Sequence, residues 1–191
     1  MASERDTRAA EDAIAAFLRA VGAPVDSDPE LRETHRRVVE AYTGDLLAGY
    51  AEDPAAILAD TTSTSAPGLV LLRRVQTSTL CPHHLMPATG VVHVGYFPGN
   101  RVVGLGALVR LVHCFAKRLS LQEDLGEHVA AALVTHLGAR GAGCVVDFES
   151  TCVTARGERA HGARTTSHAW AGELREGGAL RAEFLQALSA A

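Results

Sequence analysis

Residues that could bind a metal ion and transfer protons are concentrated in one stretch of the sequence, residues 80–85. Cys81 and His84 are three residues apart, so one turn of the chain can present a thiolate and an imidazole to the same ion, and His83 lies between them. Soft sulfur combined with borderline nitrogen suits Zn²⁺. Alternatively, Cys81 is a small buried residue and the histidines are surface residues; this spacing alone does not separate the two interpretations.

The other cysteines, Cys114, Cys144 and Cys152, each stand alone in the sequence. A structural zinc site uses four protein ligands, usually including a second Cys/His pair. The sequence contains no such pair. If zinc binds, a distant cysteine must complete a three-ligand site and leave one position open for water, which is the arrangement of catalytic zinc.

Cys152 is the candidate third ligand, because it follows an apolar run predicted to be a strand, and Arg156 lies four residues further on. An arginine near a metal is well suited to an anionic substrate group. Gln122 and Glu123 open a predicted helix, where they could accept N–H groups from a guanine-type edge. From their spacing alone, the favoured interpretation is an exposed first turn, in which the helix dipole stabilises the glutamate.

Composition excludes several classes of protein. The chain has 191 residues, enough for one domain with a sizeable core, and a net charge of −4, so we expect no general attraction to nucleic acids or anionic membranes. No apolar run approaches the ~18 residues of a membrane span, and the first twenty residues do not resemble a signal peptide. The unpaired cysteines favour a reducing, cytoplasmic location.

Periodicity predicts the elements that must position these residues. The apolar spacing indicates an N-terminal helical region and linker (1–67), followed by a domain (68–191) that contains the candidate metal ligands. The expected helices span 4–21, 29–49, 105–119, 121–137 and 180–188, and the expected strands span 68–79, 89–97 and 143–154, with a further strand over 165–170 and a short extension over 101–104. Residues 51–67 read as a loop, either a flexible hinge or an ordered arm. The result is an α+β chain with an antiparallel sheet, whose unprotected edges favour pairing with other subunits.

Taken together, these segments resemble the GTP cyclohydrolase I family. The resemblance runs from about residue 76 to residue 188, with a weaker match at 33–38. The matching segments are Cys81–His84, Gly90–Pro98, Val103–Leu105, Arg110–Val112, Phe115–Leu119, Gln122–Glu123, Cys152–Gly157 and Glu183–Leu185.

The resemblance implies the tunnelling fold, assembled into a toroidal homo-oligomer, typically a decamer, with active sites between subunits. It implies zinc held by Cys81, His84 and Cys152, which would activate water for attack on the purine. His83 would be the acid/base that protonates the imidazole nitrogen of the substrate as the ring opens.

The resemblance also implies how the substrate is held. Glu123, with Gln122, would bind the guanine edge, and Arg110 and Arg156 would hold phosphates. The family converts GTP into 7,8-dihydroneopterin triphosphate with release of formate. The expected partners are therefore a guanine-type nucleotide and further copies of the chain.

The sequence departs from the family at a position that transfers protons. Ser150 replaces a histidine that the family has two residues before the last zinc cysteine. A hydroxyl does not titrate near pH 7, so Ser150 could position a water but could not act as the base. His161 or His168 could supply the missing imidazole.

Other departures lie on the expected phosphate side of the site. The family has an acidic residue at Pro82, Ser-Lys at Gly106-Ala107 and a lysine at Glu40. The last two changes remove positive charge, and this loss would weaken the binding of a triphosphate strongly in a partly desolvated site.

Three hypotheses follow. The first is a working GTP cyclohydrolase I. The second is a diverged paralogue in specialised metabolism, which takes a less phosphorylated guanine-type substrate or stops at the ring-opened formamidopyrimidine. The third is a non-catalytic subunit that binds a pterin or a partner protein, against which the intact zinc triad argues.

Overall fold

The computed structural model describes residues 6–66 and 68–190 of the chain. The expected α+β class with an antiparallel sheet is confirmed. Residues 4 and 5 of the first expected helix, and Pro67 of the expected loop, lie outside the described residues. The α-helices are α1 (Thr7–Ala20), α2 (Thr34–Ala41), α3 (Pro54–Ile57), α4 (Leu105–Ala116), α5 (Gln122–Ala132), α6 (Thr151–Thr154) and α7 (Ala179–Ser189).

A four-stranded sheet in the order β2-β3-β5-β6 forms the body of the molecule, and every neighbouring pair is antiparallel. A smaller sheet pairs β1 with β4. The strands are β1 (Thr61–Ser63), β2 (Val70–Leu80), β3 (Pro87–Phe97), β4 (Arg101–Val103), β5 (Gly141–Ser150) and β6 (Thr165–Gly172). Strands β2 and β6 are the edges of the large sheet.

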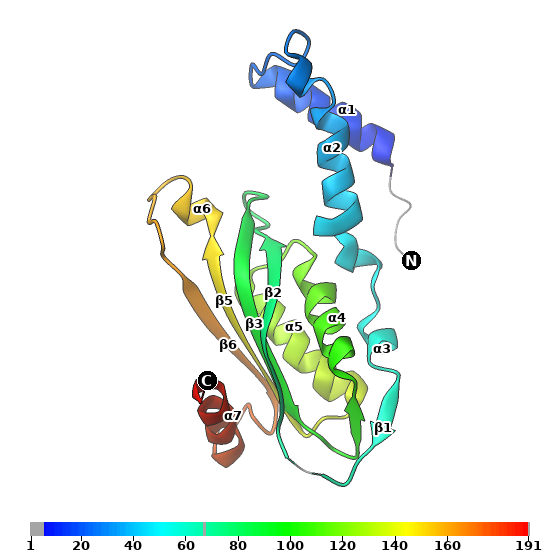
Figure 1. Ribbon diagram of the computed structural model, residues 1–191, viewed down its shortest axis with the longest axis vertical. Coiled ribbons are helices and arrows are strands. Elements are labelled where there is room, and N and C mark those ends of the chain that lie inside the picture. The colour runs from blue at the N-terminus through cyan, green and yellow to red at the C-terminus, as the bar shows by residue number, and fades with distance from the viewer. Residues whose placement is uncertain (1–5, 67, 191) are drawn as a thin grey trace.

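Helices α4 and α5 cover one face of the large sheet (Figure 1), and the main core lies between them and the strands. Leu108, Leu111, Leu125 and Val129 point inward from these helices and are fully buried. Helix α5 continues into a π-helical turn, η4 (Leu133–Leu137). Burial of this apolar helix face against the alternating inward residues of the strands is the main source of stability.

Helix α7 packs on the opposite face of the sheet, over positions that lack side chains. A Cβ atom at Gly143 would lie 2.6 Å from the ring of Trp170 and 3.0 Å from that of Phe184. Phe184 is fully buried, and its ring meets Trp170 edge-on with a centroid separation of 5.2 Å. Glycine at residue 143 therefore creates the space that receives the aromatic residues of this second, smaller cluster.

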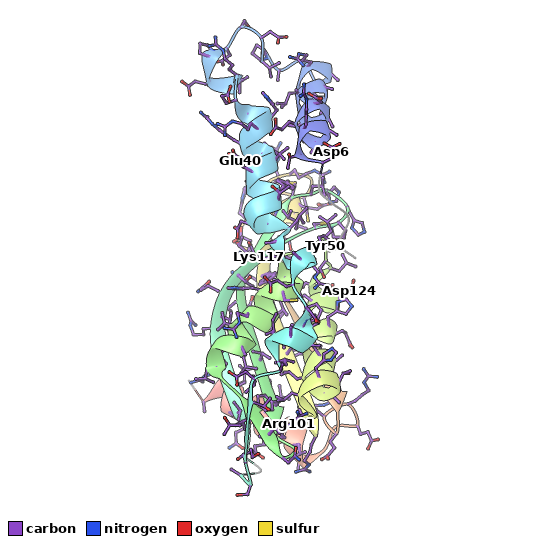
Figure 2. The ribbon with its side chains drawn as sticks, turned by 90° about the vertical axis from the view of Figure 1, so that its right-hand side faces the viewer. Asp6, Glu40, Tyr50, Arg101, Lys117 and Asp124 are labelled. Carbon is purple, nitrogen blue, oxygen red and sulfur yellow. The ribbon has the colours of Figure 1, made fainter. Side chains whose placement is uncertain are left out.

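The N-terminal helices form an arm that extends away from the body (Figure 1). We define the arm as residues 7–46. In Figure 2 Asp6 and Glu40 mark the arm, and Arg101 lies at the opposite end of the molecule. No residue of α1 is buried, and Val39 is the buried residue of α2.

The continuous helix expected over residues 29–49 is wrong. The segment is divided into the 3₁₀ turn η1 (Pro29–Leu31), α2, the π-helical turn η2 (Tyr42–Leu46) and the 3₁₀ turn η3 (Ala48–Ala51). The Thr43 hydroxyl donates to the Val39 carbonyl at 2.7 Å. Such back-bonding competes with the regular helix pattern and accounts for the local widening.

Residues 51–66 of the expected linker form regular elements that pack along the body. Asp53 accepts a hydrogen bond from the Ala55 amide at 2.9 Å and caps α3, and Pro54 opens that helix. Ile57 and Leu58 are buried in the core, and β1 pairs with the expected short extension, which is β4. These contacts fix the linker along the body.

The strand expected over residues 143–154 ends earlier than predicted. β5 stops at Ser150, and the next residues form the helical turn α6. The candidate ligand Cys152 therefore lies on a turn, where its side chain is free of the alternation that a strand imposes. Within the described ranges, no helix is long and apolar enough to cross a membrane.

Candidate active site

The turn between β2 and β3 forms the first half of the candidate site. We define the metal loop as residues 81–86. It closes on itself, because the Cys81 amide donates to the Met86 carbonyl and the Leu85 amide donates to the Cys81 carbonyl, both at 2.9 Å. Leu85 has φ 54°, in the left-handed region, which costs a leucine about 1–2 kcal/mol. The loop is thus a specific turn whose conformation must be maintained by its surroundings.

Cys152 reaches this loop through the pairing of β5 with β3. Ser150 pairs with Ala88 at the start of β3, and the Thr151 hydroxyl donates to the Pro87 carbonyl at 2.6 Å. The helical turn α6 then places Cys152 beside the metal loop. Two segments far apart in the sequence meet at the end of the sheet that faces the arm (Figure 1).

The predicted metal ligands come together in the structure. One ligand atom each from Cys81, His84 and Cys152 lies within 4.8 Å of the others, and the Cys81 Sγ–His84 Nδ1 distance is 3.7 Å. Zinc bonds of about 2.0–2.3 Å would place tetrahedral ligands roughly 3.3–3.8 Å apart. Two thiols and one imidazole therefore fit a zinc ion after a small closing movement of the group.

The electrostatics of the two cysteines favour a bound cation. Partial burial and the neighbouring Cys81 sulfur raise the pKa of the Cys152 thiol, and the nearby Arg156 charge opposes this rise. The raised pKa favours the protonated thiol of Cys152, and a bound divalent cation would favour its thiolate form instead.

A pocket of about 210 Å³ opens beside these ligands and contains most of the residues predicted from the sequence. His83, Glu123 and Ser150 line it together with Cys81 and Cys152. The remaining lining residues are Thr79, Ala88, Ser120, Leu121, Gln122 and Thr165. The start of α5 is held here because the Ser120 amide donates to the Leu80 carbonyl at 3.2 Å.

The two residues that open α5 have different roles. The exposed first turn predicted from spacing is correct for Glu123 and wrong for Gln122, which is buried. Gln122 Nε2 donates to the carbonyls of Val146 at 2.8 Å and Thr165 at 2.7 Å. Gln122 therefore joins α5 to β5 and β6, while the Glu123 carboxylate faces the pocket.

The predicted phosphate ligands do not line this pocket. Arg156 follows α6 and is close enough to Cys152 to influence the pKa of its thiol. Arg110 is exposed on α4 and lines a different pocket of about 180 Å³, with His113 and Lys117. Within one chain, the described residues leave Arg110 apart from the metal ligands.

The histidines considered as substitutes for the missing imidazole lie elsewhere. Within the described part of the chain, neither His161 nor His168 lines the pocket. His168 stacks on Trp170, with ring centroids 6.0 Å apart, and His161 is exposed in the segment after α6.

Glu40, which stands where the family has a lysine, lies in the arm. Its carboxylate pairs there with the Arg36 guanidinium at 2.5 Å.

One contact at the metal loop has no signal in the sequence. The Tyr42 hydroxyl donates to the Leu85 carbonyl at 3.1 Å across a separation of 43 residues. The helical pattern predicts Tyr42 as part of an apolar face, and periodicity gives no information about its hydroxyl.

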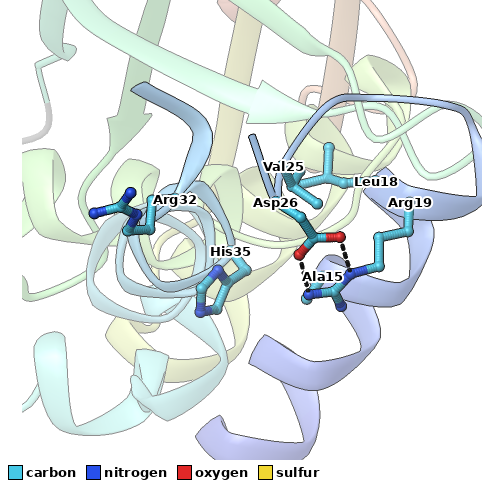
Figure 3. Close-up of a pocket in the computed structure, with 7 residues that line it drawn as sticks. All are labelled: Ala15, Leu18, Arg19, Val25, Asp26, Arg32 and His35. Atoms are coloured by element: carbon cyan, nitrogen blue, oxygen red, sulfur yellow. Dashed lines mark hydrogen bonds and ion pairs between the residues drawn. The ribbon is translucent and has the colours of Figure 1, made fainter. Parts of the chain in front are cut away.

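A second cavity, at the far end of the arm, shows no comparable chemistry (Figure 3). Arg19 at the end of α1 pairs with Asp26 in the connecting segment at 3.0 Å, and His35 and Arg32 complete the wall. The ion pair joins α1 to the connection before α2, which is a structural role.

Comparison with known proteins is consistent across nearly the whole chain. The family model described as GTP cyclohydrolase I matches residues 10–189. The GTP cyclohydrolase 1 of Corynebacterium glutamicum is 42% identical over 182 residues, covering 94% of this chain and 92% of that protein. That of Mycobacterium ulcerans is 41% identical over 185 residues, covering 94% and 89%. A crystal structure of an archaeosine synthase QueF-like protein covers 58% of this chain and 99% of that one, with a TM-score of 0.45 and 18% identity.

Proposed function

This chain belongs to the GTP cyclohydrolase I family, and from that premise we propose that it is a zinc-dependent hydrolase that opens the imidazole ring of GTP. The product would be 7,8-dihydroneopterin triphosphate, with release of formate. The observation that carries the proposal is the convergence of three metal-ligand atoms within 4.8 Å, beside a pocket lined by His83 and Glu123.

Cys81, His84 and Cys152 would hold the zinc ion. When bound, zinc would supply a Lewis acid that lowers the pKa of a water toward neutrality. Three protein ligands leave one coordination position open, as catalytic zinc sites require. Cys81 and Cys152 are partly buried and line the pocket, whereas His84 is exposed and lines the groove on the side of the arm.

His83 would transfer protons in the ring-opening step. Its ring lies 6.2 Å from that of His84, centroid to centroid, and the two rings are nearly perpendicular. The two ring nitrogens of an imidazole can donate and accept protons, so His83 would give a proton to a purine nitrogen and recover it. Its position next to a metal ligand places that proton close to the bond that breaks.

Glu123 would accept N–H groups of the guanine edge with its carboxylate. The buried amide of Gln122 positions that turn, because it bonds to the backbone of β5 and β6. Arg156 would bind phosphate near the metal ligands. Since Arg110 lies apart from the pocket within one chain, we propose that a neighbouring copy in a toroidal homo-oligomer supplies it.

Ser150 lines the pocket where the family has a histidine. Its hydroxyl can orient a water but cannot accept a proton near pH 7. The complete reaction is proposed over the shortened one because His83, Glu123 and the metal ligands share one site. A non-catalytic subunit would have no use for an open coordination position.

The test is incubation of the zinc-loaded protein with GTP, and separately with GMP, guanosine and guanine, followed by mass spectrometry for ring-opened species, formate and pterins. We expect dihydroneopterin triphosphate and formate from GTP. Accumulation of a formamidopyrimidine, or turnover restricted to a less phosphorylated purine, would overturn the complete reaction. Cys152→Ser is the control for adventitious hydrolysis.

A further inference from the structure

The arm meets the metal loop at the hydroxyl of Tyr42. This residue begins η2, just after α2, and donates to the Leu85 carbonyl at 3.1 Å. Leu85 directly follows the ligand His84 in the chain. A group on the arm thus bonds to the backbone carbonyl of the residue that follows a proposed metal ligand.

The conformation of Leu85 makes this contact important. Its φ of 54° is in the left-handed region, which a leucine adopts only when its surroundings hold it there. Its amide is bonded inward to Cys81, and its carbonyl is bonded outward to Tyr42. If the outer bond is lost, the peptide can relax toward an unstrained conformation and turn His84 away from Cys81.

Packing supports the same relation. Tyr42, His84 and Leu85 line one groove of about 610 Å³ between the arm and the metal loop, and most of its other lining residues are apolar. Leu85 is 49% exposed, so packing alone restrains it weakly. The Tyr42 hydroxyl is the directional restraint in this groove.

We propose that Tyr42 is a positioning residue for the zinc ligand His84, and that it couples the arm to the metal centre. The inference rests on the proposed zinc site. Tyr42 does not touch the metal or the substrate; it keeps the turn in the conformation that directs the imidazole toward the two cysteines. An ordered loop loses less conformational entropy when the metal binds, so affinity is higher.

The experiment compares Tyr42→Phe with a matched control, Tyr96→Phe. Each variant removes one hydroxyl and keeps the ring. The Tyr96 hydroxyl is buried in the body and accepts a hydrogen bond from the Val103 amide at 3.1 Å, so its loss lowers the melting temperature without touching the metal loop. Zinc affinity is measured at equilibrium by competition between the zinc-loaded protein and a chromophoric chelator.

We expect Tyr42→Phe to weaken zinc binding by about 10-fold, with little change in melting temperature, and Tyr96→Phe to show the reverse. Amide hydrogen exchange of the as-purified proteins gives a second readout. Protection at Cys81 and Leu85 should fall in Tyr42→Phe and persist in Tyr96→Phe.

The outcomes separate the two proposals. If the wild-type protein does not bind zinc, the proposed function fails. Hydrogen exchange at Cys81 and Leu85 then still tests whether Tyr42 stabilises the conformation of the metal loop. If the wild type binds zinc and Tyr42→Phe binds it equally well, the role of Tyr42 is overturned while the proposed function stands. Equal losses of affinity in both variants would also overturn it, because they would reflect general destabilisation.

Discussion

The body and the arm of this protein are stabilised in different ways. The body buries fully the side chains of Leu108, Leu125, Phe148 and Phe184, whereas α1 has no buried residue and leaves Phe17 60% exposed. Strand pairing and packing in the body bring the proposed metal ligands together, and the arm contributes the Tyr42 hydroxyl and one wall of an apolar groove beside them. The comparison teaches that a region with few buried residues can still influence the geometry of a distant site. Here it does so through one hydrogen bond to the backbone beside a proposed metal ligand.

The largest effect is expected where two distant parts of the body meet. Cys152→Ser should abolish stoichiometric zinc binding and reduce GTP turnover by at least about 100-fold, because two ligands cannot hold a catalytic zinc ion. Metal analysis and a GTP turnover assay measure this. Cys144→Ala, which removes a fully buried thiol distant from the metal loop, should keep both zinc and turnover. Full zinc content in Cys152→Ser would contradict the ligand assignment.

The contrast in packing predicts the next effect. Phe184→Ala should lower the free energy of unfolding by about 3–5 kcal/mol, since the fully buried ring leaves a cavity beside Trp170. Phe17→Ala, which shortens a ring that is 60% exposed where it lines the groove between the arm and the metal loop, should lower it by only about 1 kcal/mol. Urea denaturation of both variants tests the comparison. A loss in Phe17→Ala as large as that in Phe184→Ala would contradict the difference in packing between arm and body.

A smaller effect is expected at the junction of α5 with the sheet. Gln122→Leu should lower the free energy of unfolding by about 2 kcal/mol, because the carbonyls of Val146 and Thr165 each lose a buried donor. The adjacent variant Glu123→Gln should leave stability unchanged and raise the KM for GTP. Chemical denaturation and steady-state kinetics separate the two roles. An unaffected Gln122→Leu protein would show that this amide does not hold the junction.

The smallest effect is expected at the end of the arm. The Arg19 guanidinium, through its hydrogen bond and charge, lowers the pKa of Asp26 below the ordinary value of 3.8. A lowered folded-state pKa means that the ion pair stabilises the arm above pH 3.8, and that the contribution disappears as pH falls through the folded-state pKa. Asp26→Asn should therefore melt slightly below the wild type at pH 7, with the difference vanishing in acid. A difference that grows as the pH falls would contradict this sign.

Local periodicity predicted the strands and helices of the body, because each buries one regular face. The three-residue spacing of Cys81 and His84 identified these two as candidate ligands. Cys152 was predicted as the third ligand because it also carries a thiol and because the family resemblance implies it. These predictions depend on short-range patterns or on residue type. The structure brings the three together through the pairing of β5 with β3 and through the turn α6, neither of which the sequence predicted.

The features that were missed depend on contacts between distant residues. Gln122 has the local sequence of an exposed turn, and its burial follows from carbonyls on β5 and β6. Strand β1 is three residues long and is recognised only by its pairing with β4. The Tyr42 hydroxyl finds its acceptor 43 residues away. No local pattern carries this information, since the partners are chosen by the tertiary fold.

The separation of the metal ligands along the chain has a consequence for biosynthesis. Cys81 and His84 leave the ribosome together, whereas Cys152 follows only after β3, α4, α5 and β5 have been made. A nascent chain that stops short of β5 presents two ligands of the proposed zinc site, and these compete poorly for a scarce ion. Tight metal acquisition must wait until β5 has paired with β3, so metal loading becomes a late checkpoint of folding. With the proposed zinc site, a chain made in a zinc-poor cell would complete its sheet and still lack the stability that the metal would add, which would expose it to turnover by proteases.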